Sequence, residues 1–240
     1  MGILAGGVES REFAEQWLMR LKRWDTVRQT LLFPRLREII SDHQPSSVFE
    51  IGCGEGSATA MLIPAVSNDC SITATDINQT LLTECKKKFE SRVTIASLDI
   101  RNPPSIGQQF DVILCCSVLM LVDDATLRRA AAWMRAHLKD SGIALVSIVH
   151  PSWTLAANTA LAQEQLSKTI TFPAGWDGVS LSLYYRNTAW YREKLSEPQF
   201  YVKTEETITL PIDAERLGAR FSGFDTKPVY WILMLTPSCT

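Results

Sequence analysis

The chain has 240 residues, of which 46% are hydrophobic and 21% charged, and its formal net charge is −2. This is the composition of a soluble globular protein, and it offers no global basic field that would attract nucleic acid or an anionic membrane surface. The six cysteines form no C-x-x-C pair and have no metal-ligand spacing, which predicts free thiols in a reducing compartment and no metal site. The start lacks the pattern of a signal peptide, and no apolar run reaches the ~18 residues of a membrane span, so we expect a cytoplasmic protein.

Residues 1–44 predict a helical cap. Apolar residues recur at helical spacing over 10–43, and Pro34 is expected to break or kink the second half of this segment.

Residues 45–151 predict a parallel sheet. Five short apolar runs alternate with helical patterns, and this rhythm is typical of right-handed βαβ units. In the last of these helices Asp123 or Asp124 can cap the start and Gly142 can close the end. The expected strands are 47–52, 71–77, 93–99, 110–119 and 143–149.

The alternation of apolar runs and helical patterns ends after residue 151. Residues 152–206 form an irregular insertion that holds nine of the 21 aromatic residues and four of the five tyrosines. Aromatic density argues against disorder, and a segment this long is often a functional loop. Residues 207–240, which contain the apolar run VYWILML, are expected to supply the strands that complete the core sheet.

The stretch FEIGCGEG at 49–56 places three glycines directly behind the first strand. A glycine turn between a parallel strand and a helix points backbone amides at the carboxyl edge of the sheet, where ligands bind. Glu50 precedes the first glycine by two residues, and such a carboxylate suits a cationic ligand better than a pyrophosphate. The stretch resembles the E/D-x-G-x-G-x-G motif of class I S-adenosylmethionine-dependent methyltransferases.

This resemblance implies a doubly wound, mostly parallel, seven-stranded Rossmann-like sheet with S-adenosylmethionine as cofactor and S-adenosylhomocysteine as product. It also implies cofactor-binding roles for residues at the strand ends. Asp76, with the adjacent Ile77, would take the ribose hydroxyls, and Asp99 would meet the adenine amine beside the backbone amide of Ile100. The remaining expected cofactor residues are Glu50, Gly52, Gly54, Gly56 and either Ser117 or Cys116.

Each of these residues also has a structural interpretation, as a turn glycine or a helix N-cap. Arg28 or Trp24 in the N-terminal helices could meet the methionyl carboxylate. Asp111 opens its strand at the opposite edge of the sheet, so we expect it to be structural.

The sequence constrains the residues that bind the methyl acceptor less than those that bind the cofactor. His150 ends the fifth predicted strand at the ligand edge and is the candidate general base, whereas His43 and His137 are expected to be structural. Many relatives carry a histidine close after the fourth strand, and this chain has Leu119-Met120-Leu121 there. The candidate acceptor residues are aromatic and lie in the insertion: Trp153, Trp176, Tyr184, Tyr185, Trp190 and Tyr191.

The sequence therefore predicts a monomeric or homodimeric O- or N-methyltransferase that acts on a small-molecule acceptor, as in small-molecule biosynthesis. Methyl transfer needs approach and alignment more than a catalytic triad. The alternatives are a methyltransferase for protein, peptide or nucleic acid, a nicotinamide dehydrogenase, or a non-catalytic nucleoside-binding protein. The NPPS stretch at 102–105 resembles the motif of amino-group DNA methyltransferases, but it precedes the fourth strand instead of ending it.

Overall fold

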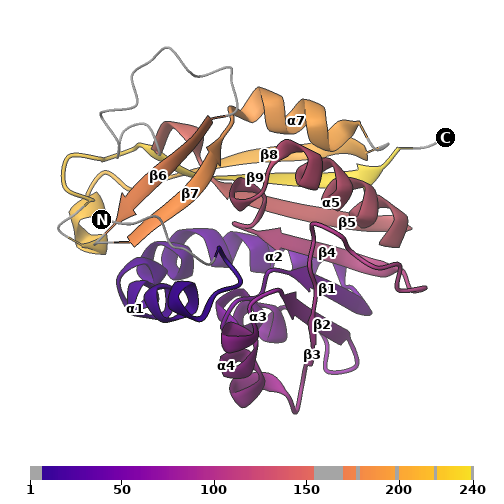
Figure 1. Ribbon diagram of the computed structural model, residues 1–240. Helices are drawn as coiled ribbons and strands as arrows, with labels where there is room; N and C mark the ends of the chain where they lie inside the picture. Colours follow the sequence, from indigo (N-terminus) through magenta and orange to yellow (C-terminus); the bar gives the residue numbers. More distant parts are fainter. Residues whose placement is uncertain (1–6, 154–169, 177–178, 198–199, 219–220, 239–240) are drawn as a thin grey trace.

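The computed structural model describes residues 7–153, 170–176, 179–197, 200–218 and 221–238 (Figure 1). Its centre is a seven-stranded sheet with the order β3-β2-β1-β4-β5-β9-β8. The first five strands are parallel, and β9 runs antiparallel to both of its neighbours. This confirms the doubly wound, mostly parallel sheet that the sequence predicts. The strands are β1 Ser47–Ile51, β2 Ser71–Asp76, β3 Thr94–Ser97, β4 Phe110–Cys116, β5 Leu138–Val149, β8 Phe200–Thr209 and β9 Pro228–Pro237.

Helices cover both faces of the sheet (Figure 1). One hydrophobic core lies between the sheet and α2, α3 and α4, and a second lies between the sheet and α5 and α7. Successive strand residues alternate between these two cores, as the pleat requires. The helices are α1 Arg11–Val27, α2 Phe33–His43, α3 Ser57–Leu62, α4 Gln79–Phe89, α5 Asp124–His137 and α7 Thr188–Ser196.

The N-terminal cap is helical, as expected. A π-helical stretch, Arg28–Leu32, connects α1 to α2, and Pro34 lies in the first turn of α2. The helical backbone runs without a break from α1 through this stretch into α2, so Pro34 lies inside a continuous helix, where its missing amide and its ring disturb the regular hydrogen bonds. The change in helix geometry therefore falls just before the proline.

Two boundaries differ from the sequence prediction. Helix α5 begins after Asp123, whose side chain accepts a hydrogen bond from the amide of Thr126, but it ends at His137, so Gly142 does not close it. Gly142 lies inside β5, where an added Cβ would come within 2.9 Å of the carbonyl oxygen of Asp111. This tight strand contact is why the glycine is needed there.

The predicted insertion contains regular structure. It holds a separate hairpin of β6 (Ile170–Trp176) and β7 (Val179–Tyr185), followed by α7. Strand β8 begins at Phe200 and pairs with β9, so residues 200–206 belong to the core sheet and not to the insertion. In Figure 1 the hairpin lies at one end of the sheet, above α1.

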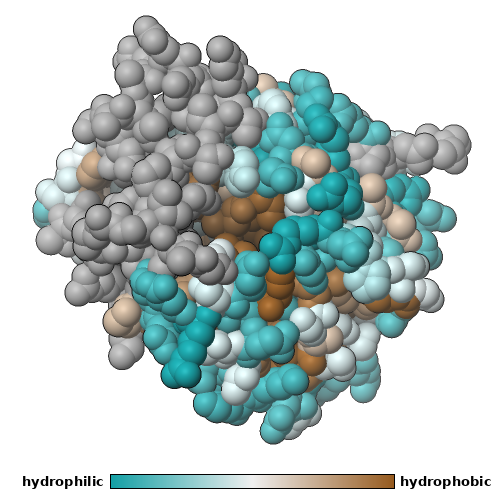
Figure 2. Space-filling view, viewed as in Figure 1, coloured by the Kyte–Doolittle hydropathy of each residue, from teal (hydrophilic) through white to brown (hydrophobic). Residues whose placement is uncertain are grey.

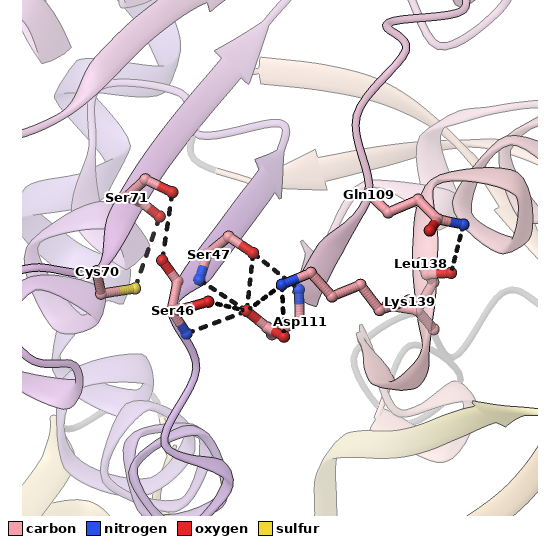
Figure 3. A network of polar contacts seen from close by, with 8 residues as sticks. All are labelled: Ser46, Ser47, Cys70, Ser71, Gln109, Asp111, Leu138 and Lys139. Atoms are coloured by element: carbon pink, nitrogen blue, oxygen red, sulfur yellow. Dashed lines mark hydrogen bonds and ion pairs between the residues drawn. The ribbon is translucent and has the colours of Figure 1, made fainter.

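Asp111 ties strands together at the amino edge of the sheet (Figure 3). Its carboxylate accepts hydrogen bonds from the amides and hydroxyls of Ser46 and Ser47 at 2.7–3.0 Å, and it pairs with Lys139 at 2.9 Å. These partners hold the pKa of Asp111 well below its usual range, although desolvation acts in the opposite direction. The contacts join the starts of β1, β4 and β5, in agreement with the structural role expected for this residue. Within the described residues, no helix is both long and apolar enough to span a membrane.

Candidate active site

A cavity of about 400 Å³ lies at the carboxyl edge of the sheet. Its walls come from the segments that follow β1, β2, β3 and β4, from the N-terminal segment and α1, and from the end of β7. In the space-filling view from the same side as Figure 1, apolar side chains lie at the bottom of a hollow near the middle (Figure 2). The strand order reverses between β1 and β4, and ligands bind open α/β sheets at such a switch point.

The glycine loop forms one wall of this cavity. Gly52 and Gly54 line it and have left-handed φ angles of 75° and 56°. The amides of Gly52 and Cys53 both donate to the carbonyl oxygen of Thr75, at 2.7 and 2.8 Å, which anchors the loop to β2.

Gly56 does not line the cavity. A Cβ at this position would come within 2.6 Å of the ring of Phe89, so Gly56 allows the loop to pack on α4. Contact of Gly56 with the cofactor stays a prediction.

Asp76 and Ile77 lie beside the glycine loop, where the resemblance expects them. One carboxylate oxygen of Asp76 accepts the amide of Gly54 at 2.8 Å, and the other accepts the amide of Asn78 at 2.8 Å. Burial raises the pKa of Asp76, although these amides act in the opposite direction. The two bonds fix the carboxylate at the cavity wall, with both oxygens in defined positions.

Asp99 and Ile100 line the cavity at the end of β3. The guanidinium of Arg101 binds Asp99 at 2.9–3.1 Å and reaches Glu9 of the N-terminal segment at 3.2 Å. Arg101 holds the pKa of Asp99 below its ordinary value. The acid therefore stays charged, and part of its hydrogen-bonding capacity is used by Arg101.

Arg28 and Ser117 also line the cavity. The side chain of Arg28 is only 12% exposed, donates to Asp25 at 2.8 Å and lies 5.8 Å from the ring of Trp17. Ser117 follows β4 with a φ of 61°, which is uncommon for a residue other than glycine and is found at functional sites. The side chain of Trp24, the alternative to Arg28, lies outside what the structure describes.

Glu50 lies below the loop and does not line the cavity. It is fully buried, and the hydroxyl of Thr59 in α3 donates to its Oε2 at 2.6 Å. Burial raises the pKa of Glu50 to about 8. In the absence of a ligand, burial therefore favours the neutral form of this carboxyl group, and a role for Glu50 beside a cationic cofactor stays a prediction.

His150 is not among the residues that line the cavity. The amide of Ser152 donates to its Nδ1 at 3.2 Å, and burial lowers the pKa of the imidazole. This contact is a local cap at the end of β5, so a role for His150 as a base stays a prediction.

Of the six aromatic candidates, Tyr184 lines the cavity. Four others pack elsewhere. Trp153 packs against Phe221 and Phe224 on one side of the sheet, and Tyr185 is only 3% exposed. Trp190 and Tyr191 pack in the core under α7. These four residues are not among those that line the cavity, so their acceptor role stays a prediction, and the side chain of Trp176 lies outside what the structure describes.

The sequence interpretation missed Trp17 and Glu55. The indole of Trp17 donates to Glu55 at 3.0 Å, and both residues line the cavity, so this bond joins α1 to the glycine loop. Glu55 lies within the glycine motif and could have been noticed. Nothing local marks Trp17, because its partner is 38 residues away.

The segment that carries the glycine loop and the ends of β2, β3 and β4 is similar to a known protein family. Residues 48–142 match the family described as "Methyltransferase domain". Residues 48–142 are thus similar in sequence to methyltransferase domains, and the fold is that of solved S-adenosylmethionine-dependent methyltransferases.

Solved structures of methyltransferases share the fold of this chain. An S-adenosylmethionine-dependent methyltransferase from Clostridium acetobutylicum is 14% identical, with a TM-score of 0.66 over 94% of this chain and 99% of that chain. The glycopeptide N-methyltransferase MtfA, in complex with S-adenosylmethionine, is 15% identical, with a TM-score of 0.56 over 80% of this chain and 86% of that one. The structure of DhpI, which is also 15% identical to this chain, is a complex with S-adenosylhomocysteine (SAH), the product of S-adenosylmethionine.

Curated relatives of this chain are much longer proteins. The highly reducing polyketide synthase pspA of Penicillium soppii is 36% identical over 95 residues, which are 34% of this chain and 4% of the relative. The reducing polyketide synthase Preu2 of Preussia isomera is 25% identical over 188 residues, which are 75% of this chain and 7% of the relative. The chain thus spans less than a tenth of these relatives.

Proposed function

We propose that this protein transfers a methyl group from S-adenosylmethionine to a small-molecule acceptor, in the cavity at the carboxyl edge of the sheet. The observation that carries this proposal is the placement of Asp76. Its carboxylate faces the cavity and is held by two amides at 2.8 Å, one of them from the glycine loop. A carboxylate in this position suits the two hydroxyls of a ribose.

The donor set around the cavity fits the rest of the cofactor. Asp99 and the amide of Ile100 suit an adenine edge, and the guanidinium of Arg28 suits a carboxylate. Gly54 leaves room for close approach, because the nearest atom to an added Cβ would be Nε1 of Trp17 at 3.7 Å. When bound, S-adenosylmethionine supplies an activated methyl group on a sulfonium.

The chain's own contribution to the reaction is positional. Asp76, Asp99 and Arg28 would fix the two ends of the cofactor, and holding reactants in place can contribute roughly 7–11 kcal/mol of a barrier. Val118, Val122 and Tyr184 line the same cavity and present apolar surface. Such a wall excludes water, which would otherwise compete as a methyl acceptor.

Calorimetry with S-adenosylhomocysteine tests the cofactor site. The wild-type protein should bind S-adenosylhomocysteine and not NADH. Asp76→Ala should weaken binding about 10- to 150-fold, because a hydrogen bond to a charged group is worth roughly 1.5–3 kcal/mol. Asp140→Ala is the matched control, because Asp140 is exposed and does not line the cavity. Equal affinity of Asp76→Ala and wild-type protein would remove Asp76 from the cofactor site.

We infer a polyketide-type acceptor as the more specific hypothesis. The curated relatives are polyketide synthases, and the part of the cavity wall formed by Val118, Leu121, Val122 and Tyr184 is mostly apolar. The second candidate is an amine acceptor, since one structural neighbour is a glycopeptide N-methyltransferase. Transfer of labelled methyl to a β-keto thioester, compared with a peptide amine of similar size, decides between them. Transfer to the amine alone would reject the polyketide hypothesis.

A further inference from the structure

Arg186 is a buried cation directly after β7, outside the group of residues that line the cavity. It is 2% exposed, and its guanidinium donates to two backbone carbonyls of the segment after β4. The acceptors are the carbonyl oxygens of Leu119 at 3.0 Å and Val122 at 2.7 Å. Leu119 begins a short 3-10 helix, Leu119–Leu121, and Val122 follows its end. A cation at the end of a helix satisfies carbonyls that have no partner within the helix.

The charge of Arg186 is balanced at the same place. Oδ1 of Asp124, in the first turn of α5, accepts from two guanidinium nitrogens at 2.8 and 3.0 Å. The rings of Tyr184, Trp190 and Tyr191 surround the guanidinium at 4.7–5.6 Å, in the range of cation–π contacts. A buried arginine is costly unless it is paired and hydrogen-bonded. These contacts fix the guanidinium in one position.

The segment that Arg186 holds is a wall of the cavity. Val118, Leu121 and Val122 all line it, and Val118 packs directly over the glycine loop. A Cβ added to Gly52 would come within 2.2 Å of a methyl group of Val118, so there is no free space between the two. A shift of this segment would therefore change the cavity on the side of the glycine loop.

Tyr184 lines the same cavity and also contacts Arg186, with 5.1 Å between the guanidinium and the centre of the ring. One side chain thus holds two cavity-lining segments that are more than 60 residues apart in sequence. Contacts between the short 3-10 helix and β7 join the same two elements.

We propose that Arg186 is a positioning residue of the methyltransferase site: it holds the segment 118–122 and Tyr184 in the arrangement that binds the cofactor. This inference rests on the proposed function, because it takes the cavity to be the cofactor site. Arg186 touches neither the cavity nor a reacting atom, and it acts through the backbone carbonyls that it binds.

The test compares Arg186→Gln with two controls on α7. Arg192→Gln removes an arginine from an exposed ion pair with Glu205 and should leave cofactor binding unchanged. Leu195→Ala removes a fully buried side chain from the core under α7 and should lower the melting temperature through packing alone. Calorimetry with S-adenosylhomocysteine is carried out well below the melting temperature of each variant.

We expect Arg186→Gln to raise the Kd for S-adenosylhomocysteine by at least about 5-fold, the lower end of typical coupling between sites. Leu195→Ala should lose stability without this change in Kd. Arg186→Lys keeps the charge and serves if Arg186→Gln does not fold. The compact ammonium of a lysine cannot reach both carbonyls and Asp124 with the geometry of a guanidinium. The Kd of Arg186→Lys for S-adenosylhomocysteine should therefore lie between the values for wild-type protein and for Arg186→Gln.

The outcomes separate this inference from the proposed function. Wild-type protein that does not bind S-adenosylhomocysteine would overturn both. Wild-type binding with an unchanged Kd in folded Arg186→Gln or Arg186→Lys would overturn the positioning role alone. A Kd that rises equally in Leu195→Ala would also overturn it, because the effect would then follow stability and not the contacts of Arg186.

Discussion

Three glycines offer a test of the site that separates backbone strain from ligand contact. Gly52, Gly54 and Gly107 all have left-handed φ angles, of 75°, 56° and 56°. An alanine in this conformation costs about 1–2 kcal/mol. An added Cβ at Gly107 would meet nothing within 4 Å, so Gly107→Ala measures this strain alone. For a chain of this length it should lower the melting temperature by about 2–8 °C.

Gly54→Ala should cost the same stability but should also weaken cofactor binding. Its Cβ would have no protein neighbour closer than 3.7 Å, so the folded protein tolerates it as well as at Gly107. The added methyl group would instead occupy space in the cavity that Gly54 lines. A misfit of about 1.4 kcal/mol or more raises the Kd for S-adenosylhomocysteine about 10-fold or more.

Gly52→Ala should cost more stability than either. Its Cβ would lie 2.2 Å from a methyl group of Val118, where ordinary contacts are 3.4–4 Å. Overpacking of this kind costs about 1–3 kcal/mol, which adds to the strain and gives about 2–5 kcal/mol in total. Binding should fall as well, because Val118 lines the cavity and has to move.

Scanning calorimetry gives the melting temperatures, and titration calorimetry with S-adenosylhomocysteine gives the affinities. The reasoning is refuted if Gly54→Ala and Gly107→Ala agree in both measurements. The glycine loop would then be a structural turn that the cofactor does not approach.

Three further predictions follow from the contacts of single residues. Asp111→Ala should lower the free energy of unfolding by about 1.5–3 kcal/mol at pH 7. The pKa of Asp111 is lowered in the folded state, so this stabilisation is present above about pH 4 and disappears as the pH falls through the folded pKa. Urea unfolding titrations at several pH values measure this loss, with Asp140→Ala as the control. Tyr184→Ala should raise the acceptor KM, whereas Tyr185→Ala should lower the melting temperature, as steady-state kinetics and thermal unfolding would show. His150→Ala should lower kcat per folded molecule by about 10²-fold or more, as expected for a general base, whereas an unchanged kcat would show that the imidazole only caps a local turn.

The fold was predictable because its signals are local. The parallel strands coincide with short apolar runs, helices follow β1, β2 and β4, and the glycine motif marks the first crossover. The end of α5 was not predictable in this way. Gly142 resembles a helix terminator, but pairing of β5 with β4 extends the strand back to Leu138. Tertiary contact overrides a local signal at that position.

The acceptor side could not be predicted from aromatic content. Tyr184 and Tyr185 are adjacent in β7, and successive residues of a strand point to opposite faces. One lines the cavity and the other is buried. The sequence shows that the segment is rich in aromatic residues, but which face meets the cavity depends on where the hairpin lies. Arg186 was missed for the same reason, because its partners are 62–67 residues away.

Glu50 shows how burial changes a chemical argument made from sequence. A carboxylate two residues before the glycines suits a cationic cofactor only if it is charged and faces that cofactor. In the structure it is fully buried, and its pKa rises to about 8 because it has lost solvent. Asp76 and Asp99, in contrast, line the cavity. Arg101 lowers the pKa of Asp99, and two amides bind the carboxylate of Asp76 and oppose the effect of burial, which raises its pKa. The negative charge facing the cavity from these strand ends therefore comes from β2 and β3, while Glu50 acts on the loop from below, through Thr59 of α3.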